Sequence, residues 1–250
     1  MKGEEYKINE LRGVRGKALM SEGKMLRYQR NHNMLTESDQ DVLKKTNVCI
    51  IGCGGLGGYV IEMLARIGVG SLTVVDGDRF DETNLNRQLL SSENNLGMFK
   101  AVAAKERILT INSETNVRSE TVFFTKENAD DIVEGHDLII DALDKIPTRL
   151  LLQEACKKHG IPLVHGAIGG WYGQVAVILP GDDTLLKLYA NNTGSGVEKL
   201  LGNPSFTPAT IASIQVSEAI KLILGKGELL RHKILYLDLL NLNYDIVMFE

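Results

Sequence analysis

Glycine residues spaced for binding phosphate groups lie between positions 52 and 57. Gly52, Gly54 and Gly57 form the pattern G-x-G-x-x-G, and Gly55 lies inside it. A glycine can adopt a positive φ angle and lets another backbone or a ligand come within contact distance. Where such a turn leads into a helix, its bare N–H groups can bind phosphate oxygens. A tight connection in an ordinary α/β unit would produce the same pattern.

Asp76 favours the nucleotide-binding interpretation of this turn. It follows Gly52 by 24 residues and ends an apolar run, close to the spacing at which an acid of dinucleotide-binding folds reaches a ribose hydroxyl. Asp78 follows two residues later in the sequence VVDGD. With the flanking apolar runs and a helix-length segment between them, the turn and the acid predict a nucleotide-binding unit.

A dense polar cluster follows in the sequence TNLNRQ, which contains Asn84, Arg87 and Gln88. It comes directly after the second apolar run, so we expect it at the carboxyl edge of the sheet, where open α/β sheets bind ligands. Lys100 lies in the first turn of the next expected helix, where a positive charge is unfavourable to the helix dipole. Lys100 therefore either binds an anionic ligand or is merely exposed.

Asp144 lies in the loop after another apolar run, DLIID at positions 137–141. Its carboxylate is a candidate ligand for Mg²⁺ at the same edge of the sheet. The alternative is an N-cap-like acid for the following helix, in which Pro147 suits the first turn.

Composition excludes several classes of protein. The 250 residues carry a formal net charge of -4, whereas a nucleic-acid partner requires a basic surface. The three cysteines, Cys49, Cys53 and Cys156, form no C-x-x-C pair, so we expect neither disulfides nor a zinc module. The N-terminal sequence lacks the apolar core of a signal peptide, and no apolar run is long enough to span a membrane. We therefore expect a cytoplasmic protein without membrane association.

A doubly wound, mostly parallel Rossmann-like α/β sheet is expected to position these residues. Five apolar strand-length runs alternate with helical segments up to position 167, a pattern typical of parallel strands with right-handed crossovers. The segment at 169–182 has no helix before it and is expected to add an antiparallel strand, as are the C-terminal runs at 233–238 and 244–249. The strongly apolar helix expected at 206–224 would lie in the core or in a subunit interface.

We expect one domain over residues 1–250, because no repeat, low-complexity tract or linker divides the chain. Residues 1–46 are polar and would form a helical arm, in which Arg27 and Arg30 lie near one helix face. An ordinary solvated basic face would show the same spacing. Residues 182–205 are irregular and are expected to form a mobile loop.

The motifs together resemble those of the MoeB/ThiF/HesA family, the bacterial relatives of ubiquitin-activating enzymes. The matching segments occur in the family's order between Leu26 and Leu224: LRYQRN, GCGGLGG, VVDGD, TNLNRQ, GMFKAVAAKERI, DALDKIPTR, PLVHGAIGGWYGQV and IASIQVSEAIKLIL. The resemblance implies an adenylyltransferase that uses ATP and Mg²⁺ and acts on the C-terminal glycine of a small ubiquitin-fold protein, with release of pyrophosphate.

The resemblance also assigns roles to particular residues. It implies that Gly55 lies at the phosphates and Asp76 at the ribose. Asn84 and Arg87 would lie beside the triphosphate, Lys100 at the nucleotide and Asp144 at Mg²⁺. Arg30 would reach into the site of a partner subunit, which implies a homodimer. The nucleotide-binding set would comprise Gly52, Gly54, Gly55, Gly57, Asp76, Asp78, Asn84, Arg87, Gln88, Lys100 and Asp144.

The expected chemistry agrees with these residue types. The attacking carboxylate is already ionised at neutral pH, so no general base is needed. Arginine, lysine, backbone N–H groups and a metal would neutralise the phosphates. No Ser-His-Asp or Cys-His arrangement is present, and we expect His136, His159 and His165 to be surface or satisfied core residues.

Three departures from the family pattern refine these expectations. The two C-x-x-C pairs that bind zinc in many members are absent, so we expect no structural zinc. The expected loop at 182–205 has no cysteine for a thioester, and Cys53 and Cys156 are better explained as small packing residues. The usual D-N-x-x-x-R is D-K-x-x-x-R here, with Lys145 after Asp144.

The principal hypothesis is adenylation of a MoaD- or ThiS-like sulfur carrier that ends in Gly-Gly, in molybdopterin, tungstopterin or thiamin biosynthesis. One alternative is an enzyme like the tRNA threonylcarbamoyladenosine dehydratases, which TNLNRQ also resembles. Another is a non-catalytic nucleotide-binding scaffold, which Arg87, Lys100 and Asp144 disfavour. An NAD oxidoreductase would need a hydride-handling site, for which the sequence offers no candidate pair.

Overall fold

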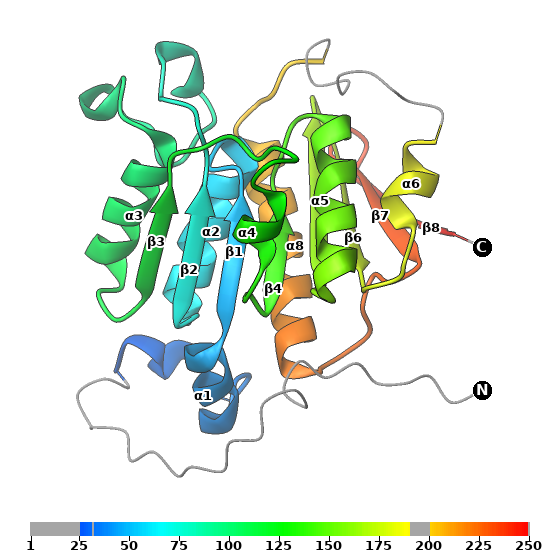
Figure 1. Ribbon diagram of the computed structural model, residues 1–250, viewed down its shortest axis with the longest axis horizontal. Helices are drawn as coiled ribbons and strands as arrows, with labels where there is room; N and C mark the ends of the chain where they lie inside the picture. Colours follow the sequence, from blue (N-terminus) through cyan, green and yellow to red (C-terminus); the bar gives the residue numbers. More distant parts are fainter. Residues whose placement is uncertain (1–25, 32, 191–200, 250) are drawn as a thin grey trace.

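The computed structural model describes residues 26–31, 33–190 and 201–249 of the chain. Over these residues one eight-stranded sheet forms, in the order β3-β2-β1-β4-β5-β6-β7-β8 (Figure 1). The strands are β1 (Asn47–Ile51), β2 (Ser71–Val75), β3 (Asn116–Glu120), β4 (Leu138–Asp141), β5 (Leu163–Gly169), β6 (Tyr172–Ile178), β7 (Lys233–Asp238) and β8 (Asn243–Met248).

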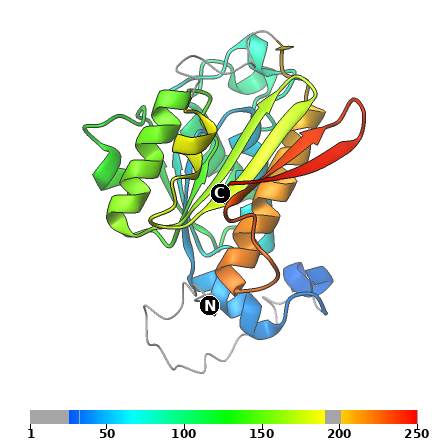
Figure 2. The ribbon, with the colours of Figure 1, turned by 90° about the vertical axis from the view of Figure 1, so that its right-hand side faces the viewer.

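The direction of the strands changes where the helical crossovers stop. Strands β1 to β5 pair in parallel, because each is joined to the next through helical segments that return the chain to the same edge. Strand β6 follows β5 through a tight turn at Gly170, whose φ angle is 58°, and pairs antiparallel with it. β7 and β8 continue the antiparallel part to the outer edge (Figure 2). The expected mixed sheet is thus confirmed.

Helices cover both faces of the sheet and bury two apolar clusters. The helices are α1 (Glu37–Lys45), α2 (Gly55–Ile67), α3 (Lys100–Ile111), α4 (Ala129–Val133), α5 (Ile146–His159), α6 (Thr184–Leu188) and α8 (Phe206–Leu224), with 3-10 turns η3 (Leu26–Asn31), η4 (Glu82–Asn84) and η5 (Glu93–Asn95). In Figure 1, α4 and α5 lie in front of the sheet, and α2, α3 and α8 lie behind it. None of the described helices is both long and apolar enough to cross a membrane.

The apolar helix expected at 206–224 is α8, and it belongs to the core. Its buried residues include Ile211, Ala212 and Leu222, and it packs against α2, β5 and β6. Ser213 and Ser217 lie on its exposed side. A place for this side in a subunit interface stays a prediction.

Two expectations about segments need correction. The helix expected from Gly97 begins at Lys100, because Gly97 has a φ angle of 82°, which no α-helix accommodates. Within the expected loop at 182–205, Thr184–Leu188 is helical; Leu185 is buried there, and its N–H donates to Gln153 Oε1 at 2.8 Å. Residues 191–200 lie outside the described part. Of the expected arm at 1–46, the described part contains η3 and α1.

The order of the strands creates a point where the chain reverses direction across the sheet. From β1 the chain moves outward through β2 to β3, and it then returns to β4 on the other side of β1. The loops that follow β1 and β4 therefore leave from neighbouring carboxyl ends, at the top of the sheet in Figure 1. Open α/β sheets bind their ligands at such a point.

Candidate active site

The glycine turn after β1 packs tightly against the loop after β4. Gly52 has a φ angle of 101°, and a Cβ atom there would lie 2.5 Å from the backbone oxygen of Ala142. A Cβ atom at Gly57 would lie 1.8 Å from the oxygen of Gly52. These two glycines therefore allow α2, the turn and the loop after β4 to touch one another.

Gly54 and Gly55 differ from Gly52 and Gly57, because the surrounding protein does not require glycine at either position. A Cβ atom would come no closer than 3.6 Å to any protein atom at Gly54 and 3.7 Å at Gly55. Gly54 is the N-cap of α2, and no side chain of the described residues caps this helix. The N–H groups of its first turn thus remain bare at the positive end of the helix dipole, as an anion-binding site requires.

Asp76 holds the glycine turn from the side of β2. Its Oδ2 accepts a hydrogen bond from the Cys53 N–H at 2.8 Å, and its Oδ1 accepts one from the Asp78 N–H at 2.8 Å. Burial raises the pKa of Asp76, and these two hydrogen bonds and the charge of Lys100 oppose that increase. A carboxylate oxygen can accept more than one hydrogen bond, so Asp76 can also accept from a ribose hydroxyl.

Lys100 is buried, so of the two alternatives for this residue the merely exposed lysine is wrong. Its side chain is 9% exposed, and its ammonium lies 3.3 Å from Asp78 Oδ2, whereas the Asp78 side chain is 56% exposed. The Lys100 N–H also donates to the backbone oxygen of Asp78 at 2.9 Å. Asp78 thus compensates a positive charge that the start of α3 would otherwise disfavour.

Gln88 and Arg87 lie directly beside the glycine turn. A Cβ atom at Gly54 would lie 3.6 Å from Gln88 Nε2, and one at Gly55 would lie 3.7 Å from Arg87 Cγ. Gln88 is buried, and its Oε1 has no hydrogen-bond partner among the described residues. A buried acceptor without a donor is unfavourable, so a hydroxyl or amino group of a ligand would stabilise it.

Asn84 takes part in the fold of its own turn. It is buried within η4, where its side chain completes a capping box with Asp81. It therefore maintains the loop that carries Arg87, whose Nη1 donates to the Thr83 oxygen at 2.8 Å. Contact of Asn84 with a triphosphate stays a prediction.

Asp144 is exposed on the loop after β4, next to the glycine turn. The N-cap of α5 is Lys145, so Asp144 does not fill that position. The described residues contain no group of three or more His, Cys, Asp or Glu that could hold a metal alone. Mg²⁺ bound to nucleotides usually takes one or two carboxylates together with phosphates and water, so a single acid here fits that ion.

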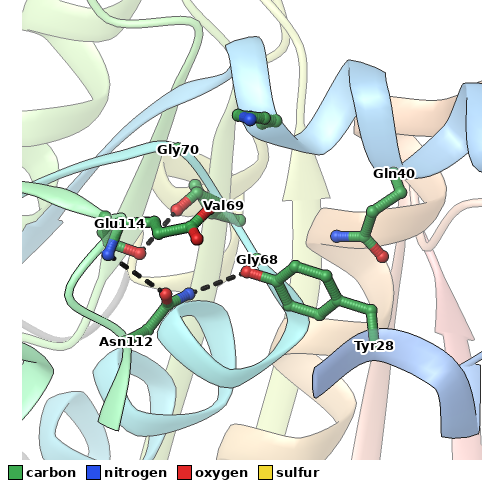
Figure 3. A pocket seen from close by; sticks show the side chains of 9 residues that line it. Tyr28, Gln40, Gly68, Val69, Gly70, Asn112 and Glu114 are labelled. Atoms are coloured by element: carbon green, nitrogen blue, oxygen red, sulfur yellow. Dashed lines mark hydrogen bonds between the residues drawn. The ribbon is translucent and has the colours of Figure 1, made fainter. Parts of the chain in front are cut away.

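Arg30 lies at the opposite end of the sheet. It belongs to η3, whose buried Tyr28 accepts a hydrogen bond from Asn112 Nδ2 at 2.9 Å, just after the end of α3 (Figure 3). α2 and α3 contain 13 and 12 residues, so about 20 Å separates this end from the glycine turn. The small cavity beside Tyr28 has a volume of about 20 Å³, enough for one water molecule.

The three cysteines are all buried, as packing residues would be. Burial raises the pKa of the Cys49, Cys53 and Cys156 thiols, so they remain protonated at neutral pH. Protonated and inaccessible thiols are poor nucleophiles.

Sequence reasoning did not identify a buried polar network behind the Asp144 loop. The Asp141 and His165 side chains are fully buried, and His165 Nδ1 lies 2.7 Å from Asp141 Oδ2. The signal was present, because these residues are partners in the register of β4 and β5. Two polar residues at equivalent positions of neighbouring buried strands indicate a pair.

The ThiF family model matches residues 28–249 of the chain. The SAMP-activating enzyme E1 of Haloferax volcanii is 34% identical, over 84% of this chain and 79% of that protein. The sulfur carrier protein adenylyltransferase of Thermus thermophilus is 35% identical, over 82% and 79%. The sulfur carrier protein ThiS adenylyltransferase of Bacillus subtilis is 37% identical over 76% of this chain, which spans 57% of that protein.

Solved structures share the fold. The crystal structure of Escherichia coli MccB with succinimide has a TM-score of 0.76, 22% identity and coverage of 89% of this chain and 70% of that one. The E. coli tRNA N6-threonylcarbamoyladenosine dehydratase TcdA in complex with ATP has a TM-score of 0.71, 26% identity and coverage of 83% and 98%. Because the family model and relatives above 30% identity cover most of its length, the chain belongs to the ThiF family.

Proposed function

We propose that this protein is an ATP- and Mg²⁺-dependent adenylyltransferase that activates the C-terminal glycine of a small ubiquitin-fold sulfur carrier. Two of the relatives above are named as adenylyltransferases of sulfur carrier proteins. The observation that carries the proposal is the uncapped start of α2 beside Arg87 and the unpartnered Gln88 oxygen. The helix start and Arg87 suit the phosphates of a nucleotide, and the Gln88 oxygen could accept from a hydroxyl or amino group of the same ligand. The pathway would be the synthesis of molybdopterin, tungstopterin or thiamin.

In the proposed reaction, a carboxylate oxygen of the carrier attacks the α-phosphorus of ATP. A new O–P bond forms, the bond between the α-phosphorus and the bridging oxygen breaks, and pyrophosphate leaves with the electron pair. The carboxylate is ionised before it attacks, so no side chain has to remove a proton. The protein instead has to hold the reacting groups in line and neutralise the phosphate charge.

The residues at the carboxyl edge of the sheet match these requirements. The start of α2 and the Arg87 guanidinium would bind phosphate oxygens, Lys100 would supply a positive charge from the start of α3, and Asp76 would accept from the ribose. Asp144 would hold Mg²⁺, which supplies further charge neutralisation when bound. Because all three thiols are buried, the product would be an acyl-adenylate, and sulfur would come from another protein.

Arg30 would act in the site of a second copy of the chain. About 20 Å separates its end of the sheet from its own glycine turn, which is farther than an arginine side chain extends. Arg30 is exposed on η3, and the described interior anchors that turn through Tyr28. A homodimer in which each subunit completes the other's site agrees with this placement.

A second candidate substrate is the carboxylate of a modified tRNA nucleoside. The chain covers 98% of TcdA at 26% identity, so no large segment of that enzyme lacks a counterpart here. The net charge of -4 disfavours tRNA, because such a partner requires a basic surface. The assay below separates the two substrates.

ATP–pyrophosphate exchange tests the proposed reaction. We expect exchange when a carrier ending in Gly-Gly is added, and none with the same carrier lacking its last two residues, because only the intact carrier presents the terminal glycine. Exchange without a carrier, or with tRNA alone, would contradict the proposal. Failure with every sulfur carrier from the same organism would also contradict it.

A pair of glycine substitutions tests the phosphate-binding turn. In Gly55→Ala the added methyl group has room in the protein but would narrow the space between the start of α2 and Arg87, where the phosphates would bind, so ATP affinity should fall by about tenfold or more without loss of stability. Gly57→Ala should lower the free energy of unfolding by about 2 kcal/mol, because its Cβ atom would collide with the Gly52 oxygen. Calorimetric ATP titration and urea unfolding measure the two effects. Unchanged ATP affinity in Gly55→Ala would refute the assigned role of the turn.

Mixed dimers test the role of Arg30. We expect Arg30→Ala and Asp144→Ala to abolish exchange separately, whereas a mixture of the two should recover about a quarter of the wild-type activity after subunits exchange. One site of each mixed dimer would combine the intact Asp144 of one chain with the intact Arg30 of the other. A mixture as inactive as either variant, despite mixed dimers in native mass spectrometry, would place both residues in the same subunit's site.

A further inference from the structure

A network of five polar side chains, three of them buried and two half-buried, lies behind the loop that carries Asp144. The side chains come from different parts of the fold and are those of Asp141 at the end of β4, Arg149 on α5, His165 on β5, Gln174 on β6 and Tyr189 just after α6. Asp141 and His165 are fully buried, and Arg149 is 4% exposed. None of the proposed chemical steps uses these groups, and a carboxylate and a guanidinium in the interior therefore need an explanation.

The hydrogen bonds of His165 define which of its ring nitrogens carries the proton. Its Nδ1 lies 2.7 Å from Asp141 Oδ2, which only accepts, so Nδ1 carries the proton. Burial lowers the pKa of His165, and the neighbouring Asp141 carboxylate opposes that decrease. In the neutral ring Nε2 is an acceptor, and it lies 3.3 Å from the Tyr189 hydroxyl and 3.2 Å from Gln174 Nε2. The charge of Asp141 is then balanced by Arg149, whose Nε lies 3.9 Å from Asp141 Oδ2.

The network ends on the peptide groups of Leu143, the residue before Asp144. Asp141 Oδ1 accepts a hydrogen bond from the Leu143 N–H at 2.9 Å. Arg149 donates to the Leu143 oxygen from Nε at 3.1 Å and also from Nη2. Both polar backbone groups of Leu143 are thus held by buried charged side chains, which restricts where the next residue can lie.

Tyr189 connects this arrangement to the segment that follows α6, on the same face of the sheet as α5. Its hydroxyl accepts from Arg149 Nη1 at 2.9 Å and from Gln174 Nε2 at 2.8 Å. The same hydroxyl can donate to His165 Nε2, which completes the network. Loss of this hydroxyl would remove one hydrogen-bond acceptor of Arg149. The Arg149 guanidinium could then turn away from the Leu143 oxygen.

We propose that Tyr189, His165 and Arg149 are positioning residues for Asp144. They hold the Leu143 peptide so that the Asp144 carboxylate meets the Mg²⁺ of a bound nucleotide, and this role rests on the proposed function of Asp144. These three side chains act on the Leu143 backbone directly or through Asp141 and one another, and we assign them no contact with the substrate. The network thereby links the end of α6 and strand β6 to the affinity for the metal-bound nucleotide.

Calorimetric titration of ATP, with Mg²⁺ and with excess EDTA, tests this role without measuring turnover. The quantity of interest is the gain in ATP affinity that Mg²⁺ provides. We expect Tyr189→Phe to reduce this gain by about fivefold and to leave ATP affinity in EDTA unchanged. Arg149→Lys keeps the positive charge but loses the planar guanidinium with its two N–H donors to Leu143, so it should reduce the Mg²⁺-dependent gain further. The matched control is Tyr236→Phe, because Tyr236 pairs with Gln174 in the β6–β7 register and none of the hydrogen bonds described for the network involves its hydroxyl. It should behave as wild type.

Asp144→Ala separates failure of this inference from failure of the proposed function. If Asp144→Ala keeps the full Mg²⁺-dependent gain, the assigned role of Asp144 is wrong. If Asp144→Ala loses the gain while Tyr189→Phe keeps it at an unchanged melting temperature, the positioning role is wrong. An equal loss of ATP affinity in EDTA and in Mg²⁺ for Tyr189→Phe would also overturn it, because that result indicates a general disturbance of the site.

Discussion

The contact between Gly52 and Ala142 joins the two loops on which the proposed site depends. The N–H of Ala142 donates to the oxygen of Ile51 at 3.0 Å, and the left-handed backbone of Gly52 leaves room for the Ala142 oxygen. Any side chain at Gly52 would force the ends of β1 and β4 apart. The contact therefore places the helix start that would bind phosphates beside the loop that carries the acid that would bind their metal.

The charges around this contact are arranged so that the site is stable before a nucleotide binds. Lys100 is paired with Asp78, and Arg149 with Asp141, so no buried charge of these pairs depends on a ligand. The unsatisfied groups are weaker ones, namely the first N–H groups of α2 and the Gln88 oxygen. A nucleotide can bind these without first breaking an ion pair between the glycine turn and its neighbours. Such preorganisation favours binding and in-line positioning over rearrangement.

Local patterns in the sequence predicted the parts of the site that are local in the chain. The glycine turn, Asp76 and the alternation of strands and helices up to β5 depend on neighbours within about 30 residues, so their spacing was sufficient. Other features depend on the register and packing of separate elements, so local patterns did not predict them. They are the ion pair of Lys100, the Asp141–His165 pair and the distance of Arg30 from the glycine turn. Helix α6 was missed because five residues show little periodicity and Leu185 is buried by contact with α5.

In the proposed reaction, ATP binds at the β1–β4 junction and AMP is transferred to the carrier and not to this protein. Intact-mass spectrometry of both proteins after incubation with ATP, Mg²⁺ and a Gly-Gly-ended carrier, quenched in acid, can follow this transfer. We expect the carrier to gain the mass of AMP less one water and this protein to keep its mass, because its three thiols are buried. A carrier joined covalently to this protein, or a protein that itself carries AMP, would show that the proposed reaction is wrong.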